Sequence, residues 1–351
     1  MAGPRGYNSY HGKISKGKIA LAVLLVLVII GALAVIRLQK YVVYDDSGRP
    51  YLDLPQFSQS AGSSADPSSD GAGDANLTIE EPTHSAVQAV QLSVGAMTQW
   101  QETWTAASAG GTYNAAVYTV KDEDGFVYLD NQFSPVSAVK TVEGAGTAIG
   151  DMLKDDGVYT VAKIACFRDS VASSADLEGM GLKNTGGYIF YDGDNKRWLD
   201  PEKSAARQYL VDLAAACAAM GFDEILLTDV SYPTVGKLDK IDYGPAATAL
   251  PDSLRETLTA FLKQMHTALA QYDVKLSIQL PASLFAGGDG DGGQSLADMV
   301  PLVDRVYADA DEDQSVFMLI EEALSASGDA DYVPVLGSLD AVSSDSYLIA
   351  P

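Results

Sequence analysis

The sequence predicts an α/β protein built around a (β/α)8 TIM-like barrel. From about Ser85 onward, short runs rich in β-branched and aromatic residues alternate with helical patterns, which indicates βα units around a parallel sheet. Eight such runs over about 265 residues match the size and order of a (β/α)8 barrel with shortened C-terminal units, and a doubly wound sheet is the alternative. The predicted strands are residues 86–94, 113–120, 159–167, 224–229, 275–280, 305–308, 332–336 and 347–349.

Two helices have clear sequence signals. One is predicted over residues 201–220, with Asp200 as the N-cap, Pro201 at the first helical position and Gly221 as the C-terminal stop. The other is predicted over residues 251–272, because apolar residues recur there at helical spacing and form a single stripe. The stripe consists of Leu254, Leu258, Phe261, Leu262, Met265 and Leu269.

The charge of the chain excludes one class of partner. The 351 residues include 23 Lys and Arg against 47 Asp and Glu, a net charge of −24. The first forty residues hold six of the basic residues and none of the acids, so the remainder is still more acidic. Such a surface repels phosphate backbones, and we expect no nucleic-acid binding. An uncharged or cationic partner fits better.

Histidine and cysteine are too scarce for common metal sites. The three histidines are His11, His84 and His266, and His11 precedes the apolar segment described next. Cys166 and Cys217 cannot form a four-thiolate zinc site or a disulfide framework. We interpret both cysteines as buried small hydrophobic residues, with a single disulfide as the alternative. No metal and no cofactor is expected.

A membrane anchor is predicted near the N-terminus. Residues 19–36 carry no charge and are bounded by Lys18 and Arg37, and eighteen apolar residues are just long enough to cross a bilayer. The basic residues of segment 1–18 predict a cytoplasmic N-terminus, with Tyr41 onward outside the cell. Ala32-Leu33-Ala34 resembles a signal-peptidase site, so a cleaved signal peptide is the alternative.

A linker separates this anchor from the barrel. Residues 56–74 are dominated by Ser, Gly, Ala and Asp, and with so little apolar mass they are predicted to form a flexible tether. The predicted organisation is therefore a basic tail (1–18), an anchor (19–36), a juxtamembrane segment with linker (37–82) and a barrel domain (83–351).

Carboxylates follow several of the predicted strands. Asp122, Asp169 and Asp229 stand at or just after the ends of the second, third and fourth strands. Parallel strands of a barrel share one carboxyl-end rim, where TIM-barrel active sites lie, so we expect all three on that rim. With histidine scarce, paired-carboxylate catalysis is the chemistry most available, and hydrolysis of glycosidic bonds is its main form. In so acidic a chain, these residues can also be solvated turn residues.

Four segments carry a resemblance to a known family. Residues 120–127 (VKDEDGFV) resemble its V-K-D-D-x-G-x-V motif, and residues 162–169 (AKIACFRD) resemble A-R-I-V-x-F-K-D. Residues 198–201 (WLDP) and 221–225 (GFDEI) match two further motifs in order. The family consists of exported bacterial proteins with a glycoside hydrolase-like TIM barrel. The likeness spans residues 86–351 and implies the same fold and carbohydrate chemistry.

The sequence departs from this family at the positions of two acids. The acid of the family's fourth strand falls on Thr228 and its arginine on Ser231, and the acid of the fifth strand falls on Gln279. Asp229 is displaced by one residue, which places it on the opposite face of a regular strand.

Candidate site residues follow from the strand ends and the motifs. Asp122, Asp169 and Asp229 are the candidate catalytic residues. The resemblance implies that the basic motif residues Lys121, Lys163 and Arg168 bind substrate. Sugar rings stack on aromatic faces, so Tyr191, Trp198 and Tyr232 are further candidates, although the three can equally be core aromatics.

Two functional hypotheses remain open. The first is an anchored extracellular glycoside hydrolase that uses Asp122 or Asp169 with Asp229 on a cell-surface or environmental polysaccharide. The second is a catalytically degenerate barrel that binds a glycan or a partner protein without cleaving it, because hydrolysis needs one group to donate a proton and another to attack or to activate water.

Overall fold

The computed structural model describes residues 42–44, 50–52, 86–93, 99–129, 144–155, 157–287, 292–309, 314–342 and 344–350. The chain divides into two compact units, Met1–Ile79 and Glu80–Pro351. In the first unit, β1 (Val42–Tyr44) pairs with β2 (Pro50–Leu52) in antiparallel fashion. The predicted anchor (19–36) and tether (56–74) lie outside the described residues. Among the residues that are described, no helix has the length and apolar character needed to cross a membrane.

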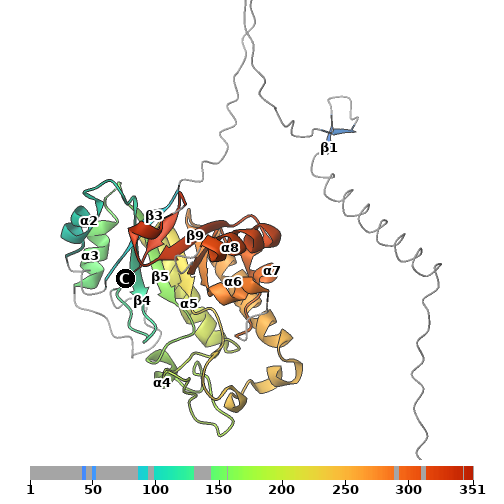
Figure 1. The fold of residues 1–351 in the computed structure, drawn as a ribbon. Coiled ribbons are helices and arrows are strands. Elements are labelled where there is room, and N and C mark those ends of the chain that lie inside the picture. Colours follow the sequence, from blue (N-terminus) through green and yellow to red (C-terminus); the bar gives the residue numbers. More distant parts are fainter. Residues whose placement is uncertain are drawn as a thin grey trace, which may run out of the picture. The chain divides into compact units, whose positions relative to one another are not determined.

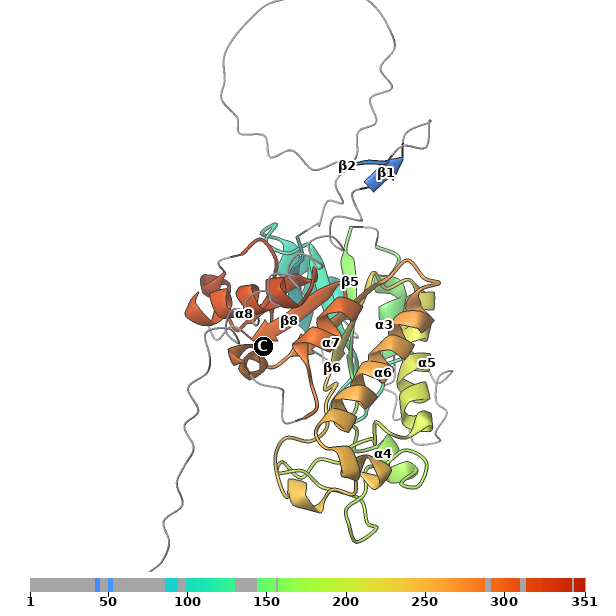
Figure 2. The same ribbon diagram turned by 90° about the vertical axis from the view of Figure 1, so that its right-hand side faces the viewer.

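The second unit contains a closed barrel of parallel strands (Figures 1 and 2). Its order is β10-β3-β4-β5-β6-β7-β8-β9, and β10 pairs with both β3 and β9, which closes the sheet. This closure confirms the predicted barrel and excludes the doubly wound alternative. The strands are β3 (Gln88–Leu92), β4 (Ala115–Lys121), β5 (Tyr159–Ala165), β6 (Glu224–Thr228), β7 (Lys275–Leu280), β8 (Arg305–Asp309), β9 (Asp331–Leu336) and β10 (Tyr347–Ile349).

Helices connect most of the consecutive strands and lie outside the barrel. In Figure 2, α5 and α6 run side by side over the outer face of the strands. The connection from β9 to β10 has, among its described residues, only the 3-10 turn η7 (Leu339–Ala341). The α-helices are α2 (Trp100–Ser108), α3 (Ala145–Met152), α4 (Ala172–Ala175), α5 (Ser204–Met220), α6 (Asp252–Leu269), α7 (Leu296–Met299) and α8 (Gln314–Ser327).

The predicted start of α5 was wrong by three residues. The Asp200 carboxylate accepts a hydrogen bond from the Glu202 backbone N–H (3.0 Å), and the Lys203 N–H donates to the Asp200 carbonyl (3.0 Å). These bonds form a separate turn before the helix. The backbone of Lys203 is extended, so α5 begins only at Ser204. Gly221 ends α5 in the left-handed conformation as predicted (φ 101°), and the predicted apolar stripe of α6 is buried.

Side chains fill the barrel in layers, because alternate residues of each strand point inward. At the amino end, Glu224 accepts hydrogen bonds from Ser277 (2.6 Å), Tyr307 (2.8 Å) and Tyr159 (2.9 Å) and pairs with Arg305. Val161 and Leu226 belong to an apolar layer of the barrel interior, in one hydrophobic cluster with Tyr307. The next inward positions along these strands stand at the carboxyl end, where the candidate site lies.

Both cysteines are free and buried, which confirms their interpretation as small hydrophobic residues. Cys166 follows β5, and Cys217 lies on α5. No disulfide joins them.

Candidate functional site

A cavity of about 570 Å³ lies at the carboxyl ends of the strands. Four of its lining residues continue the inward alternation of the barrel: Lys163 follows Val161, Thr228 follows Leu226, Gln279 follows Ser277, and Asp309 follows Tyr307. The loops after β4, β5, β6 and β7 supply the remaining wall. Besides those four, the lining consists of Glu123, Arg168, Asp192, Asp194, Trp198, Asp229, Ser231, Thr234, Val235, Leu280, Pro281, Ala282 and Gln294.

Asp229 reaches this cavity because its backbone leaves the strand conformation. Its φ is 52°, in the left-handed region that non-glycine residues rarely adopt. In a regular strand Thr228 and Asp229 would face opposite ways, but here both line the cavity, and the Thr228 hydroxyl donates to Asp229 Oδ2 (2.9 Å). The one-residue displacement predicted that Asp229 would face away from Thr228. That prediction was wrong, because the strand ends at Thr228.

The surroundings of Asp229 favour its protonated form. Burial raises the pKa of this carboxyl, and the negative charge of Glu123 raises it further. The hydrogen bond from Thr228 and the charges of Lys121 and Arg168 act in the opposite direction without cancelling the shift. A carboxyl with a raised pKa in a cavity is suited to donate a proton.

Lys163 provides a cation next to this acid. Its Nζ donates to Gln91 Oε1 (3.1 Å), which comes from the inward face of β3. Burial lowers the pKa of the Lys163 amine, whereas the charges of Asp229 and Glu123 oppose that shift. The Lys163 ammonium can orient the oxygen atoms of a ligand in the cavity.

Arg168 links the loops that wall the cavity. Its guanidinium lies 2.9 Å from Glu123 Oε2, 3.1 Å from Asp194 Oδ2 and 3.8 Å from Asp192 Oδ2. Glu123 follows β4 and the two aspartates follow β5, so one arginine holds both loops. Glu123 and Asp194 were not predicted as site residues.

Trp198 presents an aromatic side chain to the cavity while its ring nitrogen is occupied. Nε1 donates to Asp192 Oδ2 (2.8 Å), and Asp192 Oδ1 accepts from the backbone N–H groups of Asp194 (2.9 Å) and Lys196 (2.8 Å). Asp192 therefore fixes the turn of this acidic segment and the position of Trp198 together.

Asp122 and Asp169 follow β4 and β5 at the predicted rim, but neither lines the cavity. Asp122 caps a turn, accepting from the N–H groups of Asp124 (3.0 Å) and Phe126 (2.9 Å) and from the Tyr128 hydroxyl (2.7 Å). Asp169 accepts from the N–H groups of Val171 (3.0 Å) and Ala172 (2.7 Å) at the start of α4.

Lys121 is the ion-pair partner of Asp169. Its Nζ lies 3.1 Å from Asp169 Oδ2 and donates to the Ala165 carbonyl (2.6 Å), and both charged side chains are fully buried. Lys121, Asp122 and Asp169 thus bond to other groups of the barrel domain. Their neighbours Glu123 and Arg168 line the cavity instead.

The two candidate tyrosines stand outside the cavity lining. Tyr232 is 1% exposed and packs edge to face against Tyr243 with ring centroids 5.7 Å apart, so its ring offers no face to a ligand. Tyr191 is exposed, and the Arg197 guanidinium lies 5.9 Å from its ring centroid. Of the three aromatic candidates, Trp198 alone lines the cavity.

A signal in the sequence separates Asp122 from Glu123. Asp122 stands two residues before Asp124-Gly125, and an aspartate in that position often bonds the backbone of the turn that follows. That pattern indicates a turn-capping role for Asp122. Among the described residues, no group of three or more His, Cys, Asp or Glu side chains is arranged to hold a metal ion.

A TIM barrel with a carboxylate-lined cavity at its carboxyl end is the architecture of many enzymes that cleave glycosidic bonds. Residues 90–308 match the family described as "Putative glycosyl hydrolase domain", and the chain belongs to this family. The resemblance seen in the four motifs is thereby confirmed, and the domain is glycoside hydrolase-like. No curated protein matches the chain in sequence.

One solved structure shares the barrel fold. The PgaB (BpsB) glycoside hydrolase domain from Bordetella bronchiseptica is 16% identical with a TM-score of 0.53, and the match covers 72% of this chain and 84% of that one. A hypothetical protein from Ruminiclostridium thermocellum is 24% identical (TM-score 0.44, 54% and 96% covered). A chitinase from Chromobacterium violaceum is 14% identical (TM-score 0.41, 72% and 68% covered). The first of these supports the barrel fold, and nothing finer.

Proposed function

We propose that the protein is a membrane-anchored, extracellular glycoside hydrolase in which Asp229 is the proton donor. The observation that carries the proposal is the left-handed backbone of Asp229, which turns a carboxyl with a raised pKa into the cavity. Residues with strained backbones persist where the surrounding structure holds them in place, and they cluster at active sites. Asp229 would thus replace the acid that the family carries at the position of Thr228.

The second carboxylate of the reaction is assigned to Glu123. Its charge contributes to the raised pKa of Asp229, and Arg168 holds it at 2.9 Å. Asp192 already accepts hydrogen bonds from three donors. Glu123 and Asp194 are similarly exposed (57% and 64%), and of these two it is the charge of Glu123 that raises the pKa of Asp229. Asp229 would protonate the glycosidic oxygen while Glu123 attacks the sugar or activates a water molecule.

The charges of the lining favour an uncharged or cationic glycan. The cavity presents five carboxyl groups, those of Glu123, Asp192, Asp194, Asp229 and Asp309, against the two cations Lys163 and Arg168. A sulfated or uronic-acid polymer would meet repulsion there. Trp198 is only 6% exposed, but it lines the cavity, and its exposed part is the aromatic surface that a sugar ring would contact there.

A glycan-binding barrel without catalysis is the second candidate. The observation in its favour is that Thr228 and Gln279, which stand where the family carries acids, both line the cavity. In that case the ligand would be held by Trp198 and the polar lining without cleavage.

An activity assay and a binding assay on the same variants separate the two functions. Asp229→Asn should lower reducing-sugar release by about 100-fold or more, since general acid catalysis contributes factors of that order. Binding on a glycan array should persist. If the wild-type chain binds glycan but releases no sugar, and Thr228→Asp and Asp229→Asn change no rate, the protein is a binding barrel. Trp198→Ala should weaken binding in either case.

The location of the domain is a separate part of the proposal. The apolar segment 19–36 with its basic N-terminal flank supports an uncleaved anchor and an extracellular barrel. Protease added to intact cells should therefore degrade the barrel domain. A mature protein that begins at Val35 would contradict the anchor and leave export intact.

A further inference from the structure

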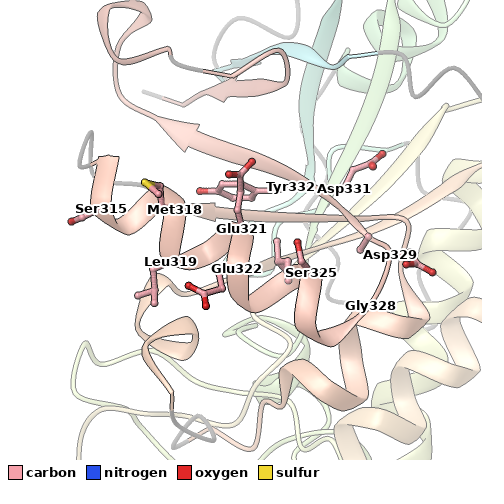
Figure 3. A pocket seen from close by; sticks show the side chains of 12 residues that line it. Ser315, Met318, Leu319, Glu321, Glu322, Ser325, Gly328, Asp329, Asp331 and Tyr332 are labelled. Atoms are coloured by element: carbon pink, nitrogen blue, oxygen red, sulfur yellow. The ribbon is translucent and has the colours of Figure 1, made fainter. Parts of the chain in front are cut away.

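A second cavity, of about 990 Å³, lies on the outer surface of the barrel between α8 and the start of β9. It shares no lining residue with the carboxyl-end cavity. Figure 3 shows α8 alongside the strand, with Met318, Leu319, Glu321 and Glu322 on the helix and Tyr332 on β9. We call this cavity, with its twelve lining residues, the α8 groove. They are Ser315, Met318, Leu319, Glu321, Glu322, Leu324, Ser325, Gly328, Asp329, Ala330, Asp331 and Tyr332.

The groove lies beside a gap in the outer layer of helices. Each connection from β3 through β9 contains an α-helix, whereas the connection from β9 to β10 has only η7 among its described residues. In a regular (β/α)8 barrel, a helix in that connection would pack beside α8. Among the described residues, the outer layer is therefore one helix short at this position.

The exposed side chains of the groove are two large apolar residues, three acids and the serines Ser315 and Ser325. Met318 is 62% exposed and Leu319 is 40% exposed, although both are large hydrophobic residues. Glu321 and Glu322 lie beside them on α8, Asp329 lies at the far end of the groove, and none of the twelve lining residues, all within the described part of the chain, is basic. Two exposed apolar side chains with acids beside them and further along the groove complement a helix that has apolar residues on one face and basic residues beside them.

We propose that the α8 groove binds an amphipathic, basic helix of a partner protein. Its apolar face would cover Met318 and Leu319, and its lysine or arginine side chains would pair with Glu321, Glu322 and Asp329. A second copy of this chain fits poorly, because the chain carries a net charge of −24 and would bring more carboxylates to the groove. An anionic membrane surface is disfavoured for the same reason.

Fluorescence anisotropy with a synthetic helix tests the proposal on the full-length chain. The probe is a labelled peptide of about 18 residues built from Leu, Ala and Lys, long enough to form a helix. Its counterpart replaces each Lys with Glu. Leu319→Asp and Glu322→Lys should each weaken binding of the basic peptide by about tenfold, whereas Asp212→Lys should change it less than about twofold. Asp212 is an exposed acid on α5, so this control alters the net charge equally at another helix.

Three outcomes would overturn the proposal. Equal losses of peptide affinity in Glu322→Lys and Asp212→Lys would show that binding depends only on the net charge of the protein. Equal binding of the basic and acidic peptides would remove the charge argument. A dimer in sedimentation that is lost in Leu319→Asp would show that a second copy covers the groove. Circular dichroism of each variant checks that the barrel remains folded.

Discussion

At the scale of single residues, the conformation of Asp229 determines which atoms meet in the cavity. A left-handed backbone costs a non-glycine residue about 1–3 kcal/mol. Neighbouring hydrogen bonds hold it in place: the Cys166 N–H donates to the Thr228 carbonyl (2.8 Å), and the Phe167 N–H donates to the Asp229 carbonyl (3.1 Å). The ladder with β5 thus continues through the position where the side-chain alternation breaks.

The raised pKa of Asp229 predicts a pH-dependent effect on stability. Folding raises the pKa of this carboxyl above its unfolded value, so the folded state retains a proton that the unfolded state releases. Wild-type stability therefore falls as the pH rises from about 3.9, the unfolded value, through the raised folded value. Asp229→Asn removes this loss and should unfold at a higher temperature than the wild type at neutral pH.

Thermal unfolding at a series of pH values measures this effect. The difference in Tm between Asp229→Asn and the wild type should grow across the window between the two pKa values and stay constant above it. Asparagine also tolerates the left-handed backbone, which contributes a gain independent of pH. A Tm difference that does not change with pH would mean that Asp229 titrates normally.

Residue roles were only partly predictable from the sequence. The strand ends located Asp229, because a parallel sheet brings the carboxyl ends of its strands to one rim. The resemblance pointed to Lys163 and Arg168, and the stacking of sugar rings on aromatic faces pointed to Trp198. The sequence could not show that Asp229 leaves the strand conformation, since no glycine or proline stands there. Glu123 was missed although the Asp124-Gly125 turn indicates that Asp122, and not Glu123, bonds the backbone.

At the scale of elements, two loops meet at glycines to form one wall of the cavity. Gly193 follows β5, and Gly236 follows β6 with a φ of 103°. The Gly193 N–H donates to the Val235 carbonyl (3.2 Å), and a Cβ on Gly236 would lie 2.7 Å from Gly193 N. Neither loop can carry a larger residue at this contact without moving.

Gly236→Ala should therefore weaken ligand binding by separating the two loops. The added methyl group meets backbone atoms, and alanine is strained at this φ, so a loss of about 1–3 kcal/mol in stability is also expected. Glycan affinity and thermal unfolding measure the two effects. Gly221→Ala is the matched control, because it has a similar φ but no atom within 4 Å of the added Cβ. Equal glycan affinity in both variants would contradict a role for this contact in the site.

The buried pair of Lys121 and Asp169 joins the end of β4 to the start of α4. Removing one partner leaves a buried charge uncompensated, so Lys121→Met should destabilise the domain by about 3–5 kcal/mol. Lys154→Met is the control, because Lys154 pairs with Asp151 on the surface with side-chain exposures of 76% and 52%. Urea unfolding measures both variants. A loss near 1 kcal/mol or less for Lys121→Met would show that the methionine packs well enough to replace the pair.

Element boundaries were predicted less well than element types. All eight strands were located, since alternating β-rich runs and helical periods are strong local signals. The start of α5 was misplaced because Asp200-Pro201 satisfies the rules for a helix start while forming a preceding turn. Tertiary contacts hold this turn: Lys203 Nζ donates to the carbonyls of Leu177 and Gly181 (2.8 and 2.6 Å), and the Asp200 N–H donates to the Met180 carbonyl (2.8 Å).

At the scale of the whole molecule, the barrel is closed by residues far apart in the sequence. β3 and β10 pair in register from Gln88 with Tyr347 to Val90 with Ile349. All eight barrel strands thus lie within the second unit, Glu80–Pro351. The number of predicted strands suggested closure, but the pairing of the first with the last depends on the stagger of the whole sheet, which no local pattern encodes.

Closure within the second unit predicts that a fragment beginning at Asn76 folds as the full chain does. It retains every barrel strand, and it lacks only residues that precede the second unit. Its circular dichroism spectrum should show the α/β signal, and its Tm should lie within about 4 °C of the value for the full chain, because a larger shift would correspond to more than about 1 kcal/mol in a domain of this size.

A fragment beginning at Trp100 provides the matched comparison, because it lacks β3 but keeps the other seven strands of the barrel. Without β3, strands β4 and β10 become open edges whose backbone N–H and C=O groups lack partners. The interior residue Ala89 is lost with it, and so is Gln91, the acceptor for Lys163. This fragment should aggregate or unfold at room temperature. If it melted cooperatively at the temperature of the longer fragment, β3 would contribute nothing to closure and the position of Lys163 would need another explanation.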